Sequence, residues 1–290
     1  RVMAIYQGVF LVTVGAGAFP GGWLAANVSL SAPFWMCAAL AGVVSVLAWL
    51  FVPETRQISH RANGKIAGGM AGPLSSRAQM AAVMAVPGFL LISLNGFAVT
   101  AARTGALFNV IPLFAEEKIG LGADQIGIGL GMISLIGLVF VYPSGLLVDR
   151  FGRKAIIVPS TIVTSAAMLL FGLSTTFEFY IFASIVWSTA SGISGATPAA
   201  YAADIAPPGM TASAMGTFRA IADSGYVVGP LALGALADAT SSVTALQVTA
   251  AILLVIGLLF AFRAPESLKR EASVISEGPP PAPDPRLHAR

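Results

Sequence analysis

Long apolar segments alternate with short polar connectors along most of the chain. Because a helix rises about 1.5 Å per residue, about 20 apolar residues cross a hydrocarbon core of ~30 Å. The pattern therefore predicts an all-α membrane protein, a helical bundle with eight transmembrane helices. These spans lie near residues 2–28, 33–52, 82–114, 122–148, 155–174, 179–203, 209–238 and 243–262.

The basic residues fall almost entirely on one side of these spans. If the first span starts in the cytoplasm, Lys118 lies in an outer loop, Arg103 and Arg219 lie within spans, and all other Lys and Arg residues lie inside. Cytoplasmic loops of membrane proteins carry such an excess of Lys and Arg. We expect a multi-pass protein of a bacterial-type cytoplasmic (inner) membrane, with residues 149–154 facing the cytoplasm.

Composition agrees with a membrane location: 56% of residues are hydrophobic and 10% are charged, whereas an ordinary soluble domain has about 25% charged residues. The net charge of +3 follows from the topology and does not indicate nucleic acid binding. Cys37, His60 and His288 have no neighbouring ligands, so we expect no metal and no disulfide. Catalytic and cofactor-binding motifs are absent from the sequence, and we expect neither an enzyme nor a cofactor.

A polar, Gly-containing and basic connector at residues 53–81 separates two predicted spans from the following six. Residues 264–290, with the proline-rich run at 278–283, predict a disordered cytoplasmic tail. The uneven division, and a first residue that is not methionine, lead us to expect a fragment of a longer protein.

A charged connector between two apolar spans carries the most specific motif of the chain. Gly145 would permit close helix approach, and Gly152 would permit a chain reversal with positive φ. Asp149 could accept hydrogen bonds from Arg153 or from a nearby helix N-terminus, forming a latch that breaks in a second arrangement of the helices. Alternatively, the basic residues only anchor helix ends to the inner leaflet. The gating-loop candidates are Gly145, Asp149, Arg150, Gly152, Arg153 and Lys154.

This spacing of glycine, aspartate and basic residues resembles the cytoplasmic loop signature of the major facilitator superfamily. The resemblance implies two six-helix halves joined by a cytoplasmic linker, of which this chain holds the fifth to twelfth helices. Residues 1–52 would then be the last two helices of the N-terminal half, 53–81 the linker and 82–263 the C-terminal half, followed by the tail at 264–290.

The resemblance also implies a function. We expect a secondary active transporter that moves a small organic solute by alternating access, with efflux favoured, protons as a candidate coupling ion, and a monomer in contact with the lipid bilayer when full length. The alternative is a membrane receptor or assembly subunit on the same scaffold that transports nothing, because one fold can host different activities.

Two glycine-rich segments resemble helices of efflux members of this family. Residues 225–238 are similar to the eleventh helix, and residues 15–25 look like a degraded antiporter signature of the fifth helix in which the proline is displaced. These glycines could form smooth contact faces, and the prolines could permit bends. Packing alone is the alternative reading. The residues concerned are Gly17, Pro20, Gly21, Gly22, Gly225, Gly229, Pro230 and Gly234.

Few ionisable residues lie within spans, where such groups usually face protein or water. Arg103 could meet an anionic group or, alternatively, bond carbonyls freed near Gly105 and Pro112. Arg219 and Asp223 are one turn apart, but their order favours only a weak intrahelical pair, so we expect partners on another helix. Asp223 is the best candidate for a protonatable carboxylate, with a structural counter-ion as the alternative.

Further polar and aromatic side chains could line a central cavity, because the resemblance places their helices beside the transport pathway. For the aromatic residues, packing or interfacial anchoring is the competing interpretation. These candidates are Asn95, Tyr142, Trp187, Ser191, Ser194 and Tyr226.

Overall fold

The computed structural model describes residues 24, 28–29, 31–51 and 75–266, and the described parts are helical with short connectors. Six helices are long and apolar enough to cross a membrane, and a bent helix makes a seventh. These correspond to seven of the eight predicted spans and confirm the all-α bundle. The predicted span at 2–28 and the proline-rich tail lie almost wholly outside the described residues.

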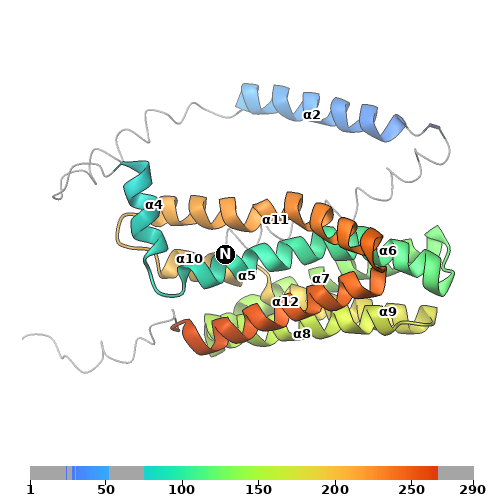
Figure 1. Ribbon diagram of the computed structural model, residues 1–290. Helices are drawn as coiled ribbons and strands as arrows, with labels where there is room; N and C mark the ends of the chain where they lie inside the picture. Colours follow the sequence, from blue (N-terminus) through green and yellow to red (C-terminus); the bar gives the residue numbers. More distant parts are fainter. Residues whose placement is uncertain (1–23, 25–27, 30, 52–74, 267–290) are drawn as a thin grey trace, which may run out of the picture.

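The elements follow one another as an up-and-down bundle (Figure 1). They are α2 (Ala32–Phe51), α4 (Ser76–Met84), α5 (Phe89–Ala101), the π-helix η1 (Ala102–Val110), α6 (Ile111–Phe114), the π-helix η2 (Ala115–Ile119), α7 (Ala123–Phe151), α8 (Arg153–Leu173), α9 (Phe177–Ser194), α10 (Thr197–Asp204), α11 (Thr211–Ala239) and α12 (Ser242–Arg263).

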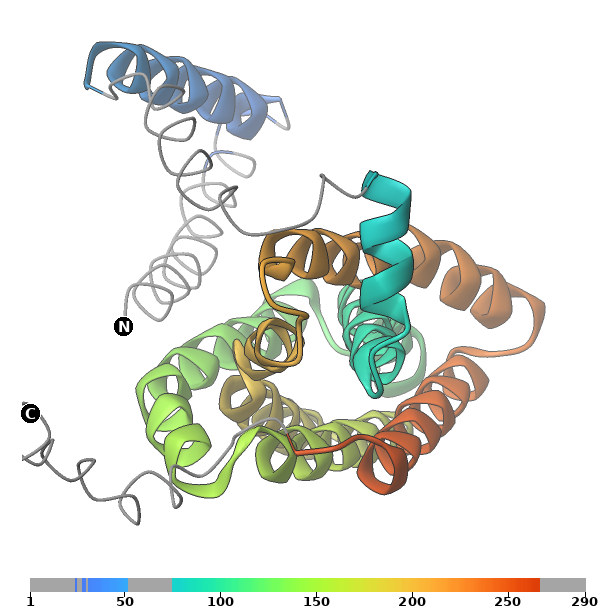
Figure 2. The same ribbon diagram turned by 90° about the vertical axis from the view of Figure 1, so that its left-hand side faces the viewer.

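Antiparallel and parallel pairs build the bundle: α12 packs on α8 and α8 on α9 as antiparallel pairs, whereas α7 on α9, and α11 on α5 and η1, are parallel pairs. Figure 2 shows these helices nearly along their axes, with α4 running across the near end. Two clusters of buried side chains fill the interior. One surrounds Trp187 and Tyr180, and the other, toward the end where α12 finishes, surrounds Tyr201 and Phe260.

Helix α2 contrasts with this bundle. None of its residues is buried, and Figures 1 and 2 show it apart from the other helices. Its side chains are nearly all apolar, including Trp35, Trp49 and Phe51. An apolar helix without protein neighbours needs lipid or further helices around it, which agrees with a membrane span.

The third predicted span, at 82–114, begins and ends later than its hydrophobic pattern indicated. Helix α4 starts inside the predicted linker, where the Ser75 side chain accepts a hydrogen bond from the N–H of Ala78. The chain then turns at Pro87 and Gly88, and the φ angle of Gly88 is 86°. A Cβ at Gly88 would lie 2.9 Å from the Tyr201 hydroxyl, so this turn requires glycine. The continuous span is Phe89–Ile119.

Helix α7, which corresponds to the predicted span at 122–148, is bent by 54° between Gln125–Phe140 and Pro143–Phe151. Pro143 lies inside the helix and has no N–H to donate, which frees a backbone carbonyl one turn earlier. The bend reaches the segment that leads into the charged connector.

Candidate functional site

The charged connector is shorter than a loop: α7 ends at Phe151 and α8 begins at Arg153, with only Gly152 between them. Gly152 has φ 94° and ψ 165°, a region of backbone space that side-chain-bearing residues rarely occupy. Its N–H donates to the Val148 carbonyl at 3.0 Å and so closes the last turn of α7. The expected chain reversal at this glycine is therefore present.

An acidic side chain caps the N-terminus of α8 at this junction. The Glu266 carboxylate accepts hydrogen bonds from the backbone N–H of Arg153 at 3.1 Å and of Lys154 at 3.4 Å. A helix N-terminus favours an anion because its first N–H groups have no partner within the helix. Asp149 was the residue expected in this role. It is instead exposed in the last turn of α7, because that helix continues past it.

Two further hydrogen bonds hold the segment that carries Glu266. Lys154 Nζ donates to the Ala264 carbonyl at 2.6 Å, and the Tyr201 hydroxyl donates to the Pro265 carbonyl at 2.6 Å. Residues 264–266 are therefore ordered, which corrects the expectation that the disordered tail begins at residue 264. A glutamate directly after the last apolar span was visible in the sequence, but nothing local linked it to a connector more than a hundred residues earlier.

Arg153 also joins two helices through its side chain. Its Nε lies 3.1 Å from Asp204 Oδ2 at the C-terminal residue of α10. The sequence pointed to Asp149 as the partner of Arg153, and in the structure Asp204 takes this place. We call the group formed by residues 150–154, Asp204 and residues 264–266 the basic end of the bundle.

At mid-depth, α11 packs against α5 and η1 through glycines. A Cβ at Gly229 would lie 2.6 Å from the Ala101 carbonyl oxygen, and one at Gly105 would lie 2.5 Å from the Gly229 carbonyl. Thr104 Oγ1 donates to the Gly225 carbonyl at 3.2 Å. We call this contact the glycine seam. Small residues let membrane helices approach closely in this way.

Gly145 and Gly234 were also expected at close helix contacts, but among the described residues the structure shows no such contact at either. Within the described part of the chain, no atom lies within 4 Å of a Cβ built on either residue. The reason for Gly234 is its spacing. Gly225 and Gly229 are four residues apart and share one face, whereas Gly234 is five residues further and is rotated away by more than a quarter turn.

A polar stripe follows the open side of α11 beside the seam. Arg219, Asp223 and Tyr226 are spaced i, i+4 and i+7, which places them on one face, and all three side chains are about half exposed. Arg219 Nη1 lies 3.8 Å from Asp223 Oδ1. The expected partners on another helix are not present in the described residues, so the two charges face each other. Arg103 of η1 precedes Thr104, whose hydroxyl donates to the Gly225 carbonyl next to Tyr226, so η1 brings Arg103 to this part of α11.

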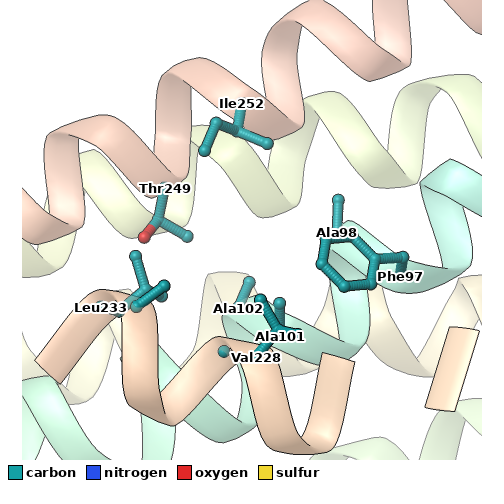
Figure 3. A pocket seen from close by; sticks show the side chains of 10 residues that line it. Phe97, Ala98, Ala101, Ala102, Val228, Leu233, Thr249 and Ile252 are labelled. Carbon is teal, nitrogen blue, oxygen red and sulfur yellow. The ribbon is translucent and has the colours of Figure 1, made fainter. Parts of the chain in front are cut away.

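The other edge of α11 borders an apolar pocket of about 180 Å³ between α5, α11 and α12. Figure 3 shows Phe97 and Ala98 of α5 facing Thr249 and Ile252 of α12, with Val228 and Leu233 of α11 closing the wall. The only hydroxyl in the lining, that of Thr249, already donates to the Ala245 carbonyl at 2.7 Å. This pocket offers no charge and no free polar group to a solute.

The other cavity candidates differ in burial. Asn95 is buried and its Oδ1 accepts a hydrogen bond from Thr161 at 3.0 Å, so it joins helices in the interior. Trp187 is fully buried in the core cluster, which also contains Ile133 of α7. Ser191 and Ser194 are partly buried, and Ser191 donates to the Ser188 carbonyl.

Several candidates cannot be placed by their side chains. The backbone of Tyr142 belongs to α7, but its side chain is not described. The small-residue and proline candidates of the first span lie outside the described residues, namely Gly17, Pro20, Gly21 and Gly22. Among the described residues, no group of three His, Cys, Asp or Glu side chains could hold a metal ion.

Long apolar helices, a basic junction at one end and a charge at mid-depth define a multi-pass helical membrane protein. Residues 89–287 match the Major Facilitator Superfamily. This match covers more than half of the chain, and the chain therefore belongs to that superfamily.

Similar proteins agree with this assignment. Multidrug resistance protein 2 of Bacillus subtilis is 29% identical over 51% of this chain and 36% of its own length. Tetracycline resistance protein class H of Pasteurella multocida is 29% identical over 60% of this chain and 44% of its own length. The crystal structure of the fucose:proton symporter FucP from E. coli superposes with a TM-score of 0.57 at 17% identity, covering 69% of this chain and 51% of FucP. The chain thus spans about half, or less, of each of these proteins.

Proposed function

We propose that the full-length protein is a secondary active transporter that moves a small organic solute by alternating access, with export as the direction and protons as the coupling ion. The observation that carries this proposal is the basic end: α8, α10 and the segment after α12 are tied together by hydrogen bonds and an ion pair. A rigid half of this kind is what rocking about a midplane site requires. The resistance proteins named above support export.

The proposal assigns residues 82–263 to the six-helix C-terminal half, 53–81 to the linker and 1–52 to two helices of the N-terminal half. The full-length protein would act as a monomer in a bacterial-type inner membrane. Helix α2, which has no buried residue in the described structure, would pack within the N-terminal half.

Asp149 has the gating role in this proposal. It is exposed beside the Gly152 junction, while the N-terminus of α8 is already occupied by Glu266. Asp149 is therefore available to a helix N-terminus of the other half. Such a contact would form in one state of the carrier and break in the other.

Transport can be measured by counterflow in proteoliposomes that contain the full-length protein. Radiolabelled tetracycline, norfloxacin and ethidium are the probes, each against an excess of the unlabelled compound inside. We expect exchange of at least one probe, and a loss of at least tenfold in Asp149→Asn. Asp238→Asn, at the opposite end of the bundle, is the matched control and should exchange normally.

Two results would contradict the proposal. If the folded protein exchanges none of these probes, a receptor or assembly subunit on the same scaffold becomes the better account. If Asp149→Asn exchanges as fast as the wild type, the protein remains a carrier but the gate does not depend on this carboxylate.

A further inference from the structure

Arg103 is a charged residue in the middle of a predicted membrane span. It lies near the middle of the 31-residue span Phe89–Ile119, within the π-helix η1. Among the described residues it has no hydrogen-bond or ion-pair partner. An unpaired charge at this depth is costly, and such residues usually serve binding or transport. π-Helical segments are rare and occur frequently at functional sites.

Among the described residues, no acid forms an ion pair with Arg103. The first acidic residue of the sequence is Glu54, so the predicted spans of residues 2–28 and 33–52 contain none. Asp223 is the acid on the neighbouring polar stripe, and Arg219 already faces it at 3.8 Å. Glu116 and Glu117 lie at the far end of the same span, and the basic-end acids lie at the other end of the bundle. The seam and stripe therefore keep one uncompensated positive charge.

The surroundings of Arg103 suit an oxyanion. The hydrogen bond from Thr104 to the Gly225 carbonyl brings the adjacent residues Arg103 and Tyr226 to the same contact between η1 and α11, and Tyr226 is 54% exposed, so its hydroxyl can donate to a ligand. A guanidinium group presents several N–H donors in a plane that matches the two oxygens of a carboxylate. The glycine seam fixes the spacing of η1 and α11, because the Thr104 hydroxyl and Gly229 leave no room for one helix to slide past the other.

Arg103 and Tyr226 lie apart from the apolar pocket. Tyr226 shares the open face of α11 with Arg219 and Asp223, whereas the pocket lies on the α12 side of the same helix. A solute with an apolar body and one charged group would be recognised on the stripe side, where both a cation and a hydroxyl are present.

We propose that Arg103 and Tyr226 form the binding site for one carboxylate group of the transported solute. This inference rests on the proposed transport function and adds the substrate class, an organic anion or a zwitterion with an accessible carboxylate. The guanidinium binds the two carboxylate oxygens and the phenol donates to one of them. A solute whose only charge is positive binds poorly, because it would meet Arg103 without a compensating acid.

Matched compounds that differ only in this group test the site in the full-length purified protein. The probes are norfloxacin with its methyl ester, and salicylate with salicylamide. Binding is measured from the rise in Tm with ligand concentration, and transport from counterflow. We expect the carboxylate member of at least one pair to bind about tenfold more tightly or better, the range for a hydrogen bond to a charged group. Arg103→Gln should abolish that preference.

Further variants separate a direct role from misfolding. Arg103→Lys keeps the charge but not the planar donor pair, so it should retain part of the preference. Tyr226→Phe should weaken binding of the carboxylate several-fold without changing binding of the neutral partner. Lys118→Gln removes a cation from the exposed outer end and should behave as the wild type.

The outcomes are distinct. The inference is overturned if the folded wild type binds neither carboxylate at millimolar concentration, or if Arg103→Gln keeps the wild-type preference. Exchange of norfloxacin or salicylate that is unaffected by Arg103→Gln would overturn the anion site and leave the carrier function standing. Binding of carboxylates through Arg103 without exchange of any probe would support the site and remove the carrier function.

Discussion

The basic end and the glycine seam hold helices together by opposite means. At the basic end, charged and polar side chains reach across from one helix terminus to another, and Glu266, Lys154 and Arg153 all have partners. At the seam, backbones meet through Gly105 and Gly229, and the nearby Arg103 is left without an ion pair. The difference indicates that polar contacts stabilise the bundle at the basic end, whereas close packing of backbones stabilises it at the seam. At the seam, Arg103 remains available to bind a ligand.

The largest expected effect is at the seam. Gly229→Ala would bring a methyl group within 2.6 Å of the Ala101 carbonyl oxygen, and the backbone cannot yield as a flexible side chain would. We expect a loss of about 2 to 3 kcal/mol in the free energy of unfolding, the upper part of the usual range for overpacking. Thermal or denaturant unfolding in detergent micelles measures this loss.

The matched control is Gly234→Ala on the same helix, where no atom lies within 4 Å of the added methyl group. Its stability should equal or slightly exceed that of the wild type, because alanine favours helix. Equal effects of the two substitutions would show that the seam does not depend on close backbone contact.

The second effect is at the Gly152 junction. Gly152→Ala places a side chain at φ 94° and, in addition, 3.1 Å from the Glu266 carboxylate. We expect a loss of about 1 to 3 kcal/mol, the cost of holding a non-glycine residue in such a conformation. Gly145→Ala, within α7 and free of contacts, should cost nothing. If Gly152→Ala and Gly145→Ala unfold at the same temperature, a side chain at residue 152 does not strain the junction.

The smallest effect is at the helix cap. Glu266→Gln keeps the shape of the side chain but removes the negative charge from the N-terminus of α8, so we expect a loss of about 0.5 to 1 kcal/mol that shrinks at high salt. Unfolding curves at two salt concentrations measure it. A variant as stable as the wild type at low salt would mean that the cap acts only as a hydrogen-bond acceptor.

The sequence alone predicts the spans well because lipid demands long apolar helices and tolerates few charges. It also predicts the Gly225 and Gly229 contacts, since residues four apart share a helix face. It does not predict the Glu266 cap, because that contact joins residues 113 positions apart and depends on how α12 lies beside α8. The direction of the Trp187 side chain could not be predicted from the sequence either. Hydrophobicity places this residue in a span, but the packing of the helices decides that its side chain is buried in the core.

The proposed transport requires a bundle that crosses the membrane with its basic end in the cytoplasm. Impermeant maleimide labelling of intact cells tests this directly, with Cys37→Ser as background and a single cysteine at either exposed position, Phe151→Cys at the basic end or Lys118→Cys at the opposite end. We expect Lys118→Cys to be labelled in intact cells and Phe151→Cys only after permeabilisation. Labelling of Phe151→Cys from outside intact cells would contradict the orientation, the gate and the proposed direction of transport together.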